Sequence, residues 1–403
     1  MSSNEEFFRE RRAAAVFKHG ILSRYTVVFA SKAGSRTAGN RVVFLDGYAG
    51  PGRYEDGSDG SPLLLAQSAE FVGSYRDVRG FFVESDVEHF ANLQMVLGEL
   101  GDPRFRALPG SIDEHLTQIL AQAGDAALFA FLDPFGAALA RSRIVGDLLR
   151  RQAGPTEILL HFSLSTVART GGLVRAILRK GRPPTSGEAL AIANLDRFLG
   201  GTWWQPAFAQ VESGDDLGMA TTVAQQVAAD FCQSVERETG FRSVAMPVRM
   251  RPEQLPKYLL VLFTRHPEGE WQFASALGKA GTDWHGAWRA EEYSKARLLE
   301  QLDGHPSLFD APGYEFDPAV YESAHRNEWI EGITANITDL LARKGHPVRL
   351  DGHVVDVYGK YLGSAWIRHV RAAVKQLYAA GLVSVPGTGE FHREPIRLLR
   401  QPP

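Results

Sequence analysis

Five short apolar runs recur along the first 165 residues, and stretches long enough for a helix separate them. The runs are 42–45, 80–83, 105–108, 127–132 and 157–162. Continuous apolar runs of this length, alternating with helices, are typical of a parallel sheet that is buried on both faces. Parallel strands need crossover connections, and each interval leaves room for one helix. The pattern therefore predicts a doubly wound, Rossmann-like α/β domain, preceded by a helix over residues 5–30.

This alternation stops after the fifth run. Residues from about 165 to 255 are read as a mostly helical insertion, with one clear helix over 220–238. Sheet character returns at 257–264, and after a turn the segment 271–273 is expected to pair with that strand as an antiparallel hairpin. The first domain is therefore expected to span residues 1–290.

The rest of the chain predicts a second, smaller domain. Residues 291–314 are polar and rich in turn formers, as in a linker, and residues 315–403 fit a winged helix. One helix is expected over 327–344, and a second is expected to be capped by Ser364 and stopped by Gly381. Its apolar face would hold Trp366, Val370, Val374 and Leu377. A hairpin is expected to begin at 382–385 and to turn through 386–389.

Composition changes this picture little. The chain has 403 residues, 44% of them hydrophobic and 23% charged, which is ordinary for a globular protein of two or three domains. The net charge of −3 means that any contact with nucleic acid needs a local basic face. A single cysteine, Cys232, rules out an internal disulfide or a Cys-rich metal site, and no metal is expected. No signal peptide or apolar run of membrane length is seen, so a cytoplasmic location without a membrane partner is expected.

The first strand leads directly into a carboxylate and a cluster of glycines: Asp46, Gly47, Gly50 and Gly52. Glycines at the end of a parallel strand let the backbone approach a nucleotide-like ligand without a Cβ in the way, and Asp46 can meet a cationic ammonium group. A plain tight turn is the alternative interpretation, and both stay open.

The second and third strands end in further polar residues. Glu84 ends the second strand, where a carboxylate can accept hydrogen bonds from ribose hydroxyls, although a solvated loop residue is the alternative. Ser111 follows the third strand, where it serves either the ligand or the next helix as an N-cap.

The fourth strand ends in Asp133, Pro134 and Phe135, which is the most specific of these signals. The carboxylate of Asp133 and a carbonyl freed by the proline can hold an exocyclic amino group, and Phe135 can stack on the base that bears it. An ordinary turn after a strand is the alternative. All of these residues follow successive parallel strands, so we expect them at one edge of the sheet.

The order of these motifs resembles that of class I S-adenosylmethionine-dependent methyltransferases. The Asp133–Gly136 turn is similar to that of tRNA guanine-amine dimethyltransferases. The chain also resembles the bacterial three-Cys-motif partner proteins over roughly residues 15–280. The matching pieces are 18–22 with Tyr25, 46–52, 56–57, 60–62, 82–84 and 131–136. The resemblance implies S-adenosylmethionine as cofactor, methylation of an exocyclic amine of a base in nucleic acid, and a protein partner that carries a three-Cys motif. The loop 53–60 and Phe135 depart from the usual methyltransferase pattern.

Several other residues have two interpretations. Lys18 and His19 lie on the first helix, either near the cofactor cleft, as the resemblance suggests, or as a solvated pair. His161, inside the fifth strand, is read as a core histidine, with a catalytic base as the alternative. Arg368, Arg371 and Lys375 lie within two turns of one helix and fit phosphate contacts or a protein-docking face.

The first hypothesis for function is therefore a methyltransferase that acts on an amine of a base. The second is a non-catalytic partner protein that binds a nucleotide or nucleic acid beside another enzyme. A small-molecule enzyme with the same fold is the third.

Overall fold

The computed structural model describes residues 13–134, 139–209, 216–303 and 316–400. These residues form two compact units. The first unit holds Thr26–Arg265, and the second holds residues 13–25 together with those from His266 onward. Our predicted division lay later in the chain, at 291–314.

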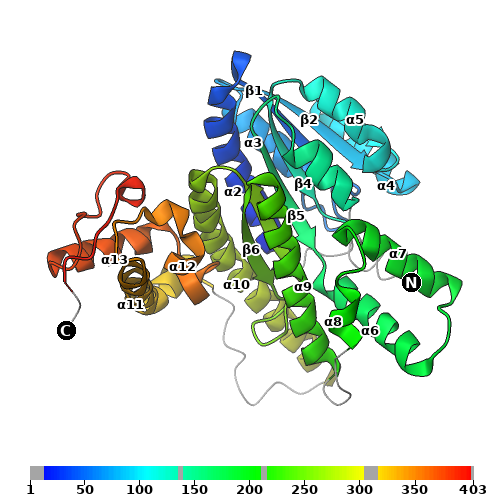
Figure 1. Cartoon of the computed structure of the whole chain (residues 1–403). Helices are drawn as coiled ribbons and strands as arrows, with labels where there is room; N and C mark the ends of the chain where they lie inside the picture. The colour runs from blue at the N-terminus through cyan, green and yellow to red at the C-terminus, as the bar shows by residue number, and fades with distance from the viewer. Residues whose placement is uncertain (1–12, 135–138, 210–215, 304–315, 401–403) are drawn as a thin grey trace. The chain divides into compact units, whose positions relative to one another are not determined.

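A seven-stranded sheet forms the centre of the first unit, with the strand order β3-β2-β1-β4-β5-β7-β6 (Figure 1). Its strands are β1 (Arg41–Asp46), β2 (Asp77–Glu84), β3 (Phe105–Pro109), β4 (Ala127–Leu132), β5 (Thr156–Phe162), β6 (Arg242–Val248) and β7 (Tyr258–Thr264). β1 to β5 are parallel, and β7 is antiparallel to both of its neighbours. All five apolar runs are strands, as predicted.

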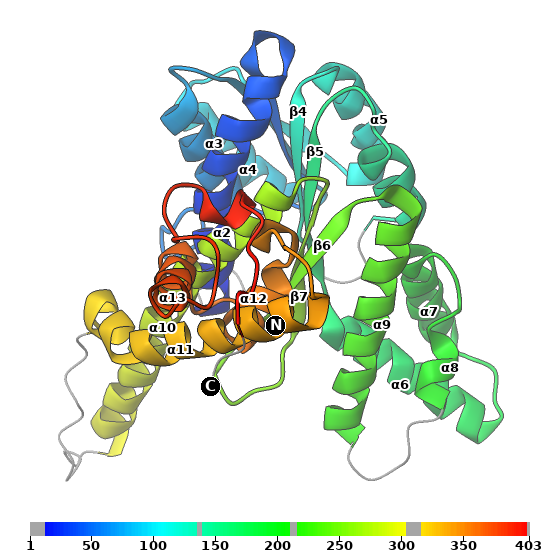
Figure 2. The same cartoon turned by 60° about the vertical axis from the view of Figure 1, so that its left-hand side comes forward.

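Helices cover both faces of this sheet. Figure 2 shows α3 (Ser61–Val72) and α4 (Val87–Leu100) on one side of the strands, and α5 (Ile112–Ala123) and α9 (Asp216–Thr239) on the other. Alternate residues of each strand bury on opposite faces, because side chains along a strand alternate in direction. The predicted fold class of this unit, a doubly wound Rossmann-like sheet with a helical insertion, is confirmed.

Both faces of β1 are packed with apolar side chains. Val43 and Leu45 join the core cluster that includes α5 and α9. Phe44 lies against Phe129, and Phe129 lies against Phe29 of helix α2 (Ala13–Ala33), with ring centroids 6.4 and 5.5 Å apart. A strand buried in this way holds its carboxyl end firmly at the sheet edge.

The insertion is helical through α6 (Leu164–Lys180), α7 (Ser186–Leu199), α8 (Gln205–Ala209) and α9. The expectation that it stays helical to about 255 is wrong, because β6 follows α9 and forms the sheet edge. β6 buries only Val244 and Val248 and contains Pro247, so its apolar pattern is weak. A proline is tolerated there because an edge strand has one side without a neighbour.

The predicted hairpin of 257–264 with 271–273 is also wrong. Helix α10 (Pro267–Asp303) begins just after β7, and it includes 291–303 of the expected linker. The other expected linker residues lie outside the described residues. Pro267 in the first turn with Glu268 and Glu270 is a helix-start signature, because proline has no N–H to leave unpaired and carboxylates favour the helix N-terminus.

The second unit packs three further helices with α10: α11 (Pro318–Lys344), α12 (Val354–Tyr358) and α13 (Ile367–Ala379). The predicted helix 327–344 lies inside α11. Val370, Val374 and Leu377 form the buried face of α13, as expected, but its N-cap is Trp366 rather than Ser364. Single antiparallel bridges join Val348 to Ile396 and Val383 to Leu398. The winged-helix assignment stays a prediction.

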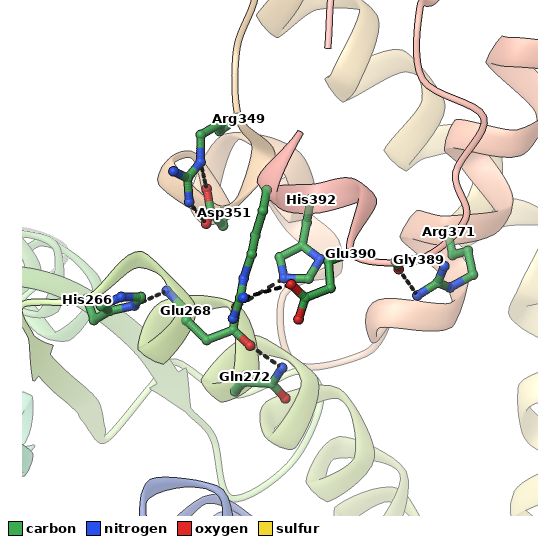
Figure 3. A network of polar contacts seen from close by, with 10 residues as sticks. His266, Glu268, Gln272, Arg349, Asp351, Arg371, Gly389, Glu390 and His392 are labelled. Carbon is green, nitrogen blue, oxygen red and sulfur yellow. Dashed lines mark hydrogen bonds and ion pairs between the residues drawn. The ribbon is translucent and has the colours of Figure 1, made fainter. Parts of the chain in front are cut away.

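A buried carboxylate ties the start of α10 to the end of the chain within this unit (Figure 3). Glu268 is 4% exposed and accepts hydrogen bonds from His392 Nε2 at 3.0 Å and from Arg393 Nε at 3.0 Å. The His392 ring stacks on Trp271, with centroids 4.7 Å apart and planes 3° apart. All of these contacts lie within the second unit.

Candidate functional site

The carboxyl ends of β1, β2, β4 and β5 meet at one edge of the sheet, because these strands are parallel neighbours. β7 runs the other way, so its first residue, Tyr258, comes to the same edge. In open α/β sheets the crevice outside these strand ends is where ligands bind. The residues predicted from the sequence in this unit were therefore expected to converge here.

The glycine turn after β1 is shaped by two left-handed residues. Gly50 has a φ of 64° and Gly52 a φ of 79°, and residues other than glycine rarely adopt such angles. Asp46 is fully buried, and its Oδ1 accepts a hydrogen bond from the Tyr48 N–H at 3.1 Å. A Cβ at Gly47 would meet Leu132 at 2.9 Å, so the turn also packs closely on β4. The turn is thus a buried, closely packed glycine turn at the carboxyl end of β1.

Glu84 joins this turn to the end of β2. Its carboxylate accepts hydrogen bonds from the N–H of Gly50 at 2.7 Å and from the N–H of Asp86 at 2.8 Å. The residue is 9% exposed. Glu84 therefore faces the glycine turn, as expected, and does not point into solvent. Its role toward a ligand stays a prediction.

Ser111 is the N-cap of α5. Its main-chain N–H donates to the Glu114 carboxylate at 2.8 Å in a capping box. This contact matches the helix-cap interpretation, in which the residue serves the first turn of the helix. A cofactor contact by Ser111 stays a prediction.

Tyr48, inside the glycine turn, is a site residue that the sequence did not single out. Its hydroxyl accepts a hydrogen bond from the Leu139 N–H at 2.9 Å. Burial raises the pKa of Tyr48 to about 12, so the phenol stays protonated at neutral pH. Tyr48 thereby links the turn after β1 to the chain that follows β4.

Asp133 and His161 form a hydrogen-bonded pair at the ends of β4 and β5. Asp133 Oδ1 lies 2.5 Å from His161 Nδ1, and the two side chains are 14% and 17% exposed. The His161 ring stacks on Tyr258, with centroids 4.1 Å apart and planes 29° apart. Pro134 is buried, and Phe135 lies outside the described residues. Sequence reasoning favoured a core role for His161 and missed this pair.

The sheet register explains the pair. Leu132 of β4 is opposite Leu160 of β5, so the next residues along the two parallel strands come side by side. Opposite residues of parallel strands point to the same face. The pairing of Asp133 with His161 can therefore be predicted from the sequence only when the register of β4 and β5 is known.

The loop 53–60 between the glycine turn and α3 is a small antiparallel turn. Arg53 bridges to Asp59, and its guanidinium also donates to Glu99 of α4 at 3.1 Å. Asp56 accepts hydrogen bonds from the main chain and the hydroxyl of Ser58, at 2.9 and 2.6 Å. The loop that departs from the methyltransferase pattern is thus fastened to itself and to α4.

Lys18 and His19 belong to the second unit, where they are 6% and 1% exposed. The interpretation of the two residues as a solvated pair is therefore wrong. A role near a cofactor stays a prediction.

Two of the three cations predicted to bind phosphate have partners inside the second unit. Arg368 forms an ion pair with Glu322. Arg371 donates to the carbonyl oxygens of Gly387 at 3.1 Å and Gly389 at 3.0 Å, and so holds the loop after α13. Figure 3 shows its contact with Gly389. Lys375 is exposed. Of the three, Lys375 is the one best placed for an external anion.

No family model matches the chain, and no curated protein matches it. Among solved structures, the chain is similar to the following three and to others. Cofactor-bound Rv0187 from MTB is 13% identical, with 63% of this chain and 89% of that one covered and a TM-score of 0.30. The cyclopropane synthase MmaA2 from Mycobacterium tuberculosis is 16% identical, covering 69% and 76%, with a TM-score of 0.22.

The third is the plantazolicin methyltransferase BamL in complex with a triazolic desmethylPZN analog and SAH. It is 10% identical, covering 65% of this chain and 88% of that one, with a TM-score of 0.28.

Within the described part of the chain, no helix has the length and apolar character needed to cross a membrane. Among the same residues, no group of three or more His, Cys, Asp and Glu side chains is arranged to hold a metal ion.

Proposed function

We propose that the chain is an S-adenosylmethionine-dependent methyltransferase whose site is the carboxyl edge of the sheet in the first unit. The observation that carries this proposal is the hydrogen bond from the Gly50 N–H to the Glu84 carboxylate at 2.7 Å. It joins a left-handed glycine turn to an acidic strand end, which is the arrangement that nucleoside cofactors use in open α/β sheets.

The residues present suit this cofactor by their chemistry. The Glu84 carboxylate can accept hydrogen bonds from ribose hydroxyls, and Asp46 supplies a buried carboxylate for the ammonium group of the amino-acid part. The left-handed Gly50 and Gly52 give the turn a backbone conformation that other residues rarely adopt, and they place it at the strand ends where the ligand would bind. When bound, S-adenosylmethionine supplies an electrophilic methyl group on a positively charged sulfur.

The acceptor in this proposal is an exocyclic amine of a nucleic-acid base. Asp133 and the carbonyl of Pro134 would accept hydrogen bonds from the amine and fix its direction, and Phe135 would stack on the base. Catalysis would then rest mainly on orientation in a site that excludes water. A base within a duplex would have to flip out of the stack first. The resemblance to three-Cys-motif partner proteins adds a protein partner to this proposal.

Calorimetric titration of the full chain with S-adenosylmethionine tests the cofactor. We expect binding by the wild type, and a loss of affinity of roughly 10- to 100-fold in Glu84→Gln, since a hydrogen bond to a charged group contributes about 1.5–3 kcal/mol. Glu88→Gln is the matched control, because it removes the same charge from an exposed position four residues later. Absence of binding by the wild type, or equal affinities of the two variants, contradicts the proposal.

Transfer of tritiated methyl groups to single-stranded and duplex nucleic acid tests the acceptor. Asp133→Ala is expected to abolish transfer and to leave cofactor affinity unchanged, because the cofactor is held by residues after β1 and β2. Binding of nucleic acid by the wild type without any transfer would favour the non-catalytic partner instead.

A further inference from the structure

We propose that His161 is the proton acceptor of this site, held in its reactive form by Asp133 and Tyr258. The proposal rests on the methyltransferase function proposed above and adds a residue to it. It is carried by the contact of 2.5 Å between His161 Nδ1 and Asp133 Oδ1 and by the stacking of the imidazole on Tyr258.

The contact with Asp133 decides which ring nitrogen carries the proton. An ionised carboxylate has only acceptors, so Nδ1 must be the donor in this hydrogen bond. In the neutral ring the lone pair then belongs to Nε2. A carboxylate that binds the far side of an imidazole also stabilises the positive charge that forms when Nε2 takes up a proton.

Stacking fixes the plane of the ring. Centroids 4.1 Å apart and planes within 29° leave the imidazole little freedom to rotate away from Tyr258. The His161 side chain is 17% exposed, so the ring is largely enclosed and partly accessible. His392, which also has a carboxylate partner, is only 5% exposed, so His161 differs from that structural histidine in being partly accessible.

The reaction releases one proton that needs an acceptor. The lone pair of the acceptor amine forms the new N–C bond while the C–S bond breaks, and the electron pair of that bond stays on sulfur, which becomes a neutral thioether. The nitrogen now bears the positive charge, and it becomes neutral when it loses a proton to His161 Nε2. The resulting imidazolium is paired with Asp133 until the proton passes to solvent.

The test compares transfer from tritiated S-adenosylmethionine to heat-denatured DNA and to total tRNA. His161→Ala is expected to lower kcat by roughly 100- to 10,000-fold, the usual contribution of a general base, with an unchanged KM for the cofactor. Added imidazole should restore part of the lost rate to His161→Ala. His346→Ala is the matched control, since His346 is exposed and lies in the other unit, and it should keep the wild-type rate.

A wild-type kcat in His161→Ala, or a loss of cofactor binding equal to the loss of transfer, overturns the role of His161 alone. If His161→Gln transfers at the wild-type rate and imidazole does not restore the rate of His161→Ala, the role of His161 is structural and the proposal is overturned. No transfer by the wild type to either acceptor overturns the proposed function and this role with it. Nitrogen-15 NMR of the imidazole gives a readout without turnover, and a proton on Nε2 with the lone pair on Nδ1 would contradict the proposal.

Discussion

The glycines of α10 let the loop 361–366 pack directly on the helix backbone within the second unit, and adding one methyl group there tests this packing. A Cβ at Gly281 would lie 1.8 Å from the carbonyl oxygen of Gly363. One at Gly278 would lie 2.1 Å from the carbonyl oxygen of Ala365. Real Cβ atoms essentially never come closer than 3.0 Å, so in Gly281→Ala the loop must retreat by about 1.2 Å (3.0 minus 1.8).

The loss of stability in Gly281→Ala depends on the core residues that this loop contains. Ala365 and Trp366 belong to the core of the unit, so a retreat of the loop pulls them from their neighbours. Overpacking of this kind costs about 1–3 kcal/mol, and a clash with main chain belongs to the upper half of that range. Alanine favours a helix over glycine by about 1 kcal/mol, which offsets part of the cost. We therefore expect Gly281→Ala to lower the free energy of unfolding by about 1–2 kcal/mol, or Tm by roughly 2–8 °C.

Urea unfolding followed by tryptophan fluorescence measures this change. Of the seven tryptophans, five lie in the second unit: Trp271, Trp284, Trp288, Trp329 and Trp366. Gly172→Ala in α6 is the control, because its Cβ would meet nothing within 4 Å, and it should leave stability unchanged or raise it by up to about 1 kcal/mol. A Gly281→Ala variant as stable as the wild type would refute the close packing of loop on helix.

Three further outcomes are expected in the second unit. Glu268→Ala should lower its free energy of unfolding by about 3 kcal/mol, measured in urea, because His392 and Arg393 lose a buried carboxylate partner. Burial, aided by neighbouring positive charge, lowers the pKa of His285 to about 4. The unfolded chain therefore takes up this proton below about pH 6.5 and the folded chain does not, so Tm should fall between pH 6.5 and 4, and less steeply in His285→Gln. If Lys375 contacts phosphate, Lys375→Gln should flatten the slope of log affinity for DNA against log salt by about 0.9, and an unchanged slope would exclude that contact.

The strands β1 to β5 and β7 could be predicted because each has an apolar run of its own, and apolar runs depend on local sequence alone. The errors fall where the local signal is ambiguous. Residues 271–273 suit a strand or a helix equally, and the carboxylates after Pro267 were the better guide. β6 buries only Val244 and Val248 because it lies at the edge of the sheet, so its pairing with β7 decides its structure.

Contacts between residues that are distant in the sequence could not be predicted. The basic cluster on α13 was correctly placed on a helix, but the sequence did not show that two of its three cations have partners elsewhere in the chain. Glu322 on α11 neutralises Arg368, and the loop carbonyls of Gly387 and Gly389 occupy Arg371. Periodicity predicts which side chains are exposed, and it does not predict which of them are already paired.

The two carboxylate contacts at the sheet edge differ in what they say about function. Glu84 binds main-chain N–H groups, so it shapes the glycine turn as well as offering a carboxylate to a ligand. Asp133 binds a side chain, in a place where the sheet has no need of polarity, since Leu132 and Leu160 fill the preceding pair of positions. Removing an ionisable pair from water carries a desolvation cost that an apolar pair avoids. Asp133 and His161 thus break the apolar pattern of their strands, and such breaks are expected where chemistry is done.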